Sequence, residues 1–211
     1  MKKRIVFIVS SVCLFIIIGL CFAIPSFAAK DQVRELIRKT GEIEKIASIK
    51  QAVPLMKGNK IYVDSNEVLI LTEKYKLSGI EDASEKALRF ILEREALYLA
   101  ATEAGYSTTQ VEAQEIVNEM KESFHKADNF NDFLEYLNGA EMREDEYWIK
   151  QVDIVAKENT MAKFVNAQKE QLKSSQNLDD EQAEKLWSDK RKVIINEQIK
   201  TDHVKVVTGA R

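Results

Sequence analysis

Few residues of this sequence could carry out conventional catalysis. The two histidines are His125 and His203, and both cysteines, Cys13 and Cys21, lie in an apolar N-terminal segment. His125 lies close in sequence to Asp128 and Asp132, but the ligand spacing of a metal site is not repeated, so a solvated helix end is the better interpretation. The sequence contains no glycine-rich phosphate loop. We therefore expect neither an enzyme nor a bound cofactor or metal.

Aromatic residues form the more informative cluster. Within 25 positions the chain places six large rings, which are our candidate peptide-binding residues: Phe124, Phe130, Phe133, Tyr136, Tyr147 and Trp148. The simpler interpretation is that all six belong to a core, because aromatic side chains bury large areas. The functional alternative is that some stay partly exposed and form an apolar cradle for unfolded segments.

The N-terminus indicates export. Lys2, Lys3 and Arg4 precede an almost uninterrupted apolar run over residues 5–24, and small residues follow Pro25. This pattern is typical of a signal peptide over residues 1–28, cleaved after Ala28. The alternative is an uncleaved membrane anchor, since the run approaches the ~20 residues that span a bilayer. We expect a secreted protein, or one attached to the outer face of the cytoplasmic membrane.

Charge argues against two classes of partner. Without residues 1–28 the chain keeps 28 basic and 34 acidic residues, a net charge of −6. Nucleic acids and anionic membrane surfaces are therefore poor partners. Any contact with a membrane would be made through the N-terminal segment, if that segment is not cleaved.

The elements that would position these residues are mainly helical. After residue 28 the chain has one proline, Pro54, and six glycines, so it has few obligatory helix stops. Apolar periodicity predicts an N-terminal helix broken near Gly41 and ended by Pro54, followed by about five further helices. Their approximate ranges are 31–52 for the first and then 82–104, 109–125, 129–139, 141–173 and 179–198.

Local signals mark several of the ends. Gly105 can adopt the left-handed conformation that terminates a helix, and Thr109 with Glu112 has the spacing of a capping box. A very short loop should therefore join two antiparallel helices. Gly139 is expected to stop the third helix of the five. Residues 60–71 contain two β-prone runs around Asp64 and should form a hairpin, or a strand with a turn.

The residues between about 60 and 164 resemble the chaperone domain of the SurA/PrsA-like foldases. The resemblance is carried by Val63–Val68 at the expected strand and turn, by the helix-turn-helix of residues 91–117, and by "FNDFLEYLNGAEMREDEYW". Two departures are Asp64-Ser65 in place of Asn-Gly, and the absence of room for a parvulin isomerase domain. We therefore expect a signal peptide or anchor over 1–28, from the N-terminal pattern, then a helical extension over 29–58 and, as the resemblance implies, a chaperone domain over 59–211.

We therefore expect an exported chaperone-like protein that binds unfolded or extended polypeptide without isomerase activity. The alternative is a cell-envelope scaffold, membrane-anchored if the N-terminal segment is not cleaved, that docks one specific partner through its helices. The last β-prone run, "HVKVV" at residues 203–207, is expected to pair with residues 60–63 and to turn Val204 and Val206 toward the helices. The fold would then contain a small β element made by its N- and C-terminal segments.

Overall fold

The computed structural model describes residues 30–207, so the expected signal peptide or anchor lies outside the described residues. Seven helices and three short strands occupy the described range, and the prediction of a mainly α fold is confirmed. In chain order they are α2 (Lys30–Ile49), β1 (Pro54–Lys57), β2 (Tyr62–Asp64), α3 (Ser65–Leu77), α4 (Ala83–Glu103), α5 (Gln110–His125), α6 (Phe130–Ala140), α7 (Glu144–Gln176), α8 (Asp180–Thr201) and β3 (Lys205–Val206).

The α4–α5 hairpin has the predicted local geometry. Gly105 has a φ of +85°, and the backbone N–H of Tyr106 donates back to the carbonyl of Ala101 over 3.0 Å. The Thr109 hydroxyl accepts from the N–H of Glu112, whose carboxylate accepts from the N–H of Thr109. The backbone groups at each end of the turn are therefore hydrogen-bonded to residues within a few positions of them.

The sheet differs from the predicted pairing. Its order is β2-β1-β3, so β3 pairs with β1, through Met56 with Val206 and Lys57 with Lys205, and not with residues 60–63. The sequence prediction does not include strand β1, because it uses Pro54 only as the end of a helix. Val204 packs against the core, but Val206 is 67% exposed, which contradicts the prediction that both face the helices.

The buried carboxylate of Asp202, at the C-terminal end of α8, connects the two ends of the chain. The predicted strand pairing was expected to make this connection. Asp202 accepts hydrogen bonds from the backbone N–H groups of Lys60 and Ile61, and its carbonyl accepts from Asn59. The N- and C-terminal segments therefore do meet, but through a side chain that caps the loop between β1 and β2.

Helix α3 replaces the second predicted β run. The carboxylate of Asp64 accepts from the backbone N–H groups of Asn66 and Glu67, and thus caps a helix where a turn was expected. Asp64 and Ser65 suit a helix N-terminus as well as a turn, so the local sequence is ambiguous.

Two glycines let α2 and α6 approach at backbone distance. Helix α2 is continuous through Gly41, and Gly139 lies inside α6, whose C-cap is Glu141 in the left-handed conformation. Both expected glycine breaks are therefore wrong. An ideal Cβ on Gly139 would lie 2.0 Å from the carbonyl oxygen of Arg38, and one on Gly41 would lie 2.2 Å from that of Tyr136.

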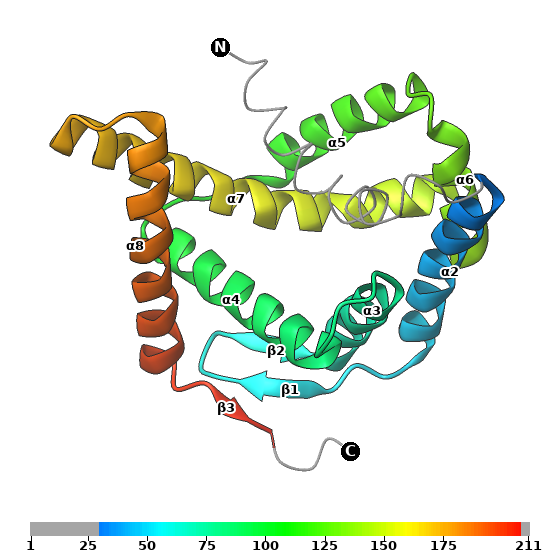
Figure 1. The fold of residues 1–211 in the computed structure, drawn as a ribbon, viewed down its shortest axis with the longest axis horizontal. Coiled ribbons are helices and arrows are strands. Elements are labelled where there is room, and N and C mark those ends of the chain that lie inside the picture. Colours follow the sequence, from blue (N-terminus) through cyan, green and yellow to red (C-terminus); the bar gives the residue numbers. More distant parts are fainter. Residues whose placement is uncertain (1–29, 208–211) are drawn as a thin grey trace.

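The apolar interior consists of two clusters joined by α7. One lies among the sheet, α4, α8 and the C-terminal half of α7, and includes Phe164 and Trp187. The other lies among α2, α5, α6 and the N-terminal half of α7, around Phe133. Figure 1 shows α7 running across both, with α2 and α3 at the end of the molecule opposite α8.

A buried ion pair connects α2 with α3 and α6. The ammonium of Lys74 on α3 lies 2.8 Å from the carboxylate of Glu44 on α2, and its side chain is only 8% exposed. The Tyr136 phenol of α6 is hydrogen-bonded to the same carboxylate, and burial together with Glu44 raises the pKa of Tyr136 well above its ordinary value. Three helices are therefore held at one carboxylate.

Candidate functional site

The six candidate aromatic rings pack against one another where α5, α6 and α7 meet. Phe133 is buried at the centre, with ring centroids 4.9 Å from Tyr147, 5.7 Å from Trp148 and 5.4 Å from Phe124. Tyr136, Tyr147 and Trp148 are also buried, whereas Phe124 and Phe130 keep part of their surface accessible. The four buried rings give little surface to a ligand in this conformation, and peptide binding by the cluster stays a prediction.

His125 lies at the rim of this aromatic cluster. Its Nε2 is 2.6 Å from the Glu144 carboxylate, and its ring packs edge-on against Phe130. Partial burial acts to raise the pKa of Glu144, but hydrogen bonds from Trp148 and His125, with the charge of Lys121, outweigh burial and lower it. His203 is exposed beside Asp202. Within residues 30–207 no group of three or more His, Cys, Asp or Glu side chains could hold a metal.

A network of charges joins α3, α4 and α7. The Glu95 carboxylate of α4 accepts from Lys157 of α7 over 2.8 Å and from Arg94 over 2.6 Å. Arg94 also donates to Glu67 of α3 over 2.6 Å. Lys157 lies over the Tyr98 ring, 5.2 Å from its centroid. Both cations of the network are therefore already engaged with carboxylates.

Glu158 is a fifth member of this charge network without a direct partner. No hydrogen bond or ion pair reaches its carboxylate from residues 30–207. Burial raises the pKa of Glu158, the charges of Arg94 and Lys157 oppose that effect, and the charges of Glu95 and Glu67 add to it. Burial in the fold therefore disfavours the charged form of this carboxylate relative to the unfolded chain.

Replacing Glu158 with glutamine should raise the thermal unfolding midpoint at neutral pH. A carboxyl group whose pKa is higher in the folded state than in the unfolded state destabilises the fold above the folded pKa, and this cost disappears below about pH 4, where both states are protonated. Scanning calorimetry of Glu158→Gln and wild type from pH 3.5 to 8 checks this expectation. Glu119→Gln, at an exposed position of α5, is the control. A lower midpoint at pH 7 would contradict it.

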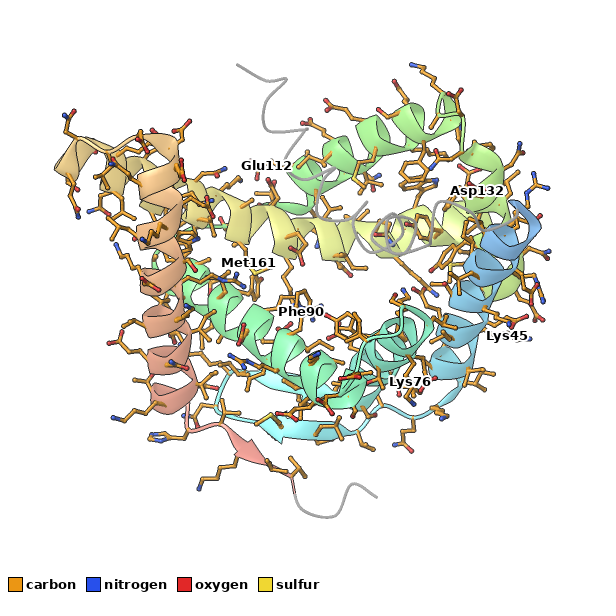
Figure 2. The ribbon with its side chains drawn as sticks, viewed as in Figure 1. Lys45, Lys76, Phe90, Glu112, Asp132 and Met161 are labelled. Atoms are coloured by element: carbon orange, nitrogen blue, oxygen red, sulfur yellow. The ribbon has the colours of Figure 1, made fainter. Side chains whose placement is uncertain are left out.

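Two half-exposed apolar side chains lie one turn before this charge network. Phe90 precedes Arg94 on α4 by four residues, and Ile154 precedes Glu158 on α7 by four residues, so each pair lies on one face of its helix. Both Phe90 and Ile154 are 46% exposed. Figure 2 shows Phe90 projecting from α4 toward the side on which α7 lies, and Met161 from α7 toward α4.

The surface formed by five residues is called the α4–α7 face below: Phe90, Arg94, Ile154, Glu158 and Glu67. Helices α4 and α7 run in the same direction, as the contacts of Lys157 with Glu95 and of Phe164 with Tyr106 show, so Phe90 and Ile154 both lie on the N-terminal side of the contact between Glu95 and Lys157. The face therefore combines two apolar side chains with one partly buried, unpaired carboxylate. None of the aromatic residues singled out from the sequence belongs to it.

A polar pocket of about 320 Å³ lies on the opposite side of Lys157. Its walls include Tyr98 and Thr102 of α4, Thr108 of the hairpin turn, and Asp153 and Thr160 of α7. With about 100° between successive helical residues, Asp153 and Thr160 lie to one side of Lys157 while Ile154 and Glu158 lie to the other. The hydroxyls of Thr102 and Thr160 donate to carbonyls of their own helices, so much of the wall is already hydrogen-bonded.

The sequence contains a weak signal for the α4–α7 face. Phe90 falls outside the apolar stripe of Leu88, Ile91 and Leu92, and Ile154 falls outside that of Val152 and Val155. Apolar residues on the polar side of an amphipathic helix could have been noted, but single exposed apolar residues are common on protein surfaces. What distinguishes Phe90 and Ile154 is that they lie on two different helices, each next to the same charge network.

Comparisons with known proteins give no relative from which a function could be transferred. No protein-family model, curated protein or solved structure significantly matches this chain. None of the helices in the described range combines the length and the hydropathy that crossing a bilayer requires.

Proposed function

We propose that this is an exported chaperone-like protein that binds unfolded or extended polypeptide and has no isomerase activity. The observation that carries the proposal is the α4–α7 face, where Phe90 and Ile154 leave nearly half of their surfaces exposed on neighbouring helices. Exposed apolar side chains next to polar groups are typical of binding surfaces, because covering them removes apolar area from water.

Several properties support binding in place of catalysis. Arg94 and Lys157 are already paired with carboxylates of the fold, and the aromatic rings pack against one another, so these groups support the frame of the site. The resemblance of residues 60–164 to the SurA/PrsA-like chaperone domain supports the same proposal, as does the basic and apolar N-terminus for export. Binding should be weak and tolerant of sequence, since a small apolar surface must offset the ordering of a flexible client.

The purified full-length protein should suppress aggregation of a chemically denatured client at a stoichiometric ratio. The double variant Phe90→Ser with Ile154→Ser should lose this effect and should bind an unfolded polypeptide at least tenfold more weakly, a loss of about 1.4 kcal/mol. Light scattering and fluorescence anisotropy measure the two quantities. Ile149→Ser removes a more exposed isoleucine elsewhere on α7 and is the matched control.

The alternative function, a scaffold for one envelope partner, predicts a different result. Crosslinking in cells followed by isolation of the protein should yield many unrelated polypeptides if it is a chaperone, and one stoichiometric partner if it is a scaffold. If the double variant suppresses client aggregation as well as wild type does, the binding site does not lie on the α4–α7 face.

A further inference from the structure

We propose that the α4–α7 face selects polypeptide segments in which a lysine or arginine stands beside apolar residues. This inference rests on the proposed binding of unfolded polypeptide and adds to it a preference for one class of sequence. The occupant is a basic and apolar segment of a client, with its cation at Glu158 and its apolar side chains against Phe90 and Ile154.

The apolar part of the preference follows from helix geometry. Phe90 and Arg94 lie on one face of α4, and Ile154 and Glu158 lie on one face of α7. An extended chain advances about 3.3 Å per residue, whereas one helical turn rises about 5.4 Å, so the apolar pair and the carboxylate are separated by one or two residues of a bound strand. A cation adjacent to an apolar side chain therefore matches the arrangement.

The basic part of the preference follows from the balance of charges. Three carboxylates, Glu67, Glu95 and Glu158, face two cations, Arg94 and Lys157, and these cations form ion pairs with Glu67 and Glu95. The surplus negative charge is therefore located at Glu158. A carboxylate that is already partly removed from water gains more from a new cation than a fully hydrated one, because less water has to be displaced on binding.

Acidic segments are disfavoured by the same arrangement. A glutamate of the client placed beside Glu158 would meet like charge from α3, α4 and α7, and no cation of the network is free to compensate it. Discrimination between basic and acidic segments should therefore exceed discrimination between basic and neutral ones.

Three labelled unstructured peptides test the inference on the full-length protein. They are identical except for the centre, which is Leu-Lys-Phe, Leu-Gln-Phe or Leu-Glu-Phe. At pH 7.5 and low salt, the lysine peptide should bind about tenfold more tightly than the glutamate peptide and several-fold more tightly than the glutamine peptide. The preference should fall with added salt, since the ion pair is partly screened.

Glu158→Gln should abolish the preference for lysine over glutamine, measured as the ratio of the two affinities. Because this variant is expected to be more stable than wild type at pH 7.5, lost binding could not be attributed to unfolding. Glu119→Gln changes the net charge equally on α5 and should keep the preference. Lowering the pH should remove the preference at a higher pH than for an ordinary carboxylate, because burial raises the pKa of Glu158.

The possible results separate the two proposals. Equal affinity for all three peptides, or a lysine preference that survives in Glu158→Gln, overturns the inference while leaving polypeptide binding in place. Failure of every peptide and of the denatured client to bind overturns both. A preference lost in Glu158→Gln and retained in Glu119→Gln supports the inference.

Discussion

Gly139→Ala is expected to lower the thermal unfolding midpoint by about 10 °C, although alanine is the better helix former. In an exposed helix the change from glycine to alanine stabilises by about 1 kcal/mol. Here the new methyl group would lie 2.0 Å from the carbonyl oxygen of Arg38, so α2 and α6 must separate along their whole contact. Overpacking against backbone costs about 3 kcal/mol, and each kcal/mol shifts the midpoint of a domain of this size by about 2–4 °C.

Whether the unfolding midpoint falls or rises in Gly139→Ala shows whether Gly139 is needed for the close approach of α2 and α6. Thermal denaturation followed by circular dichroism measures the midpoint, and Asn138→Ala, one residue away on the exposed side of α6, is the matched control. The control should be neutral or slightly stabilising. A midpoint that rises in Gly139→Ala would show that α2 and α6 do not pack at backbone distance.

Asp202→Ala should destabilise the protein by about 3 kcal/mol, because it leaves the backbone N–H groups of Lys60 and Ile61 without their acceptor. Ile61 is almost completely buried, so water cannot readily replace the carboxylate. The loss should appear in urea denaturation as a lower midpoint with an unchanged slope. Amide exchange of Lys60 and Ile61 should become faster in the variant.

Asp189→Ala supplies the control for Asp202, because Asp189 lies on α8, the helix that Asp202 follows, and its largely exposed side chain forms an ion pair with Lys192. It should change stability by less than about 0.5 kcal/mol. Equal effects of the two substitutions would mean that the loop from Gly58 to Ile61 is held by strand pairing and not by Asp202.

Local chemistry made the helical hairpin predictable. Gly105, Thr109 and Glu112 act on backbone groups within a few residues, so their roles follow from spacing alone. Asp179, at the start of the last predicted helix, likewise caps α8 together with Gln182. The long α7 was predictable because no glycine or proline interrupts it.

Residues whose roles depend on distant partners could not be assigned from the sequence. A glycine that ends a helix and a glycine that admits another helix look alike in sequence, and Gly139 proved to be of the second kind. Asp202 has backbone partners 141 and 142 residues away. The same limit applies to the candidate site, where the aromatic cluster was visible in the sequence but the exposure of Phe90 and Ile154 was not.

The contact of Asp202 with Lys60 and Ile61 also bears on the order in which the fold can be completed. A ribosome makes the chain from its N-terminus, so β1, β2 and α4 exist long before the residue that caps their loop. Contacts of such large sequence separation form late, since the entropy of closing the loop precedes any gain from the contact. The cluster around Phe133 is complete once α7 has been made, whereas the cluster around Trp187 must wait for the last tenth of the chain. During synthesis the protein should therefore pass through a state with one half folded and the other still open, and in that interval it would itself resemble the unfolded chains that it is proposed to bind.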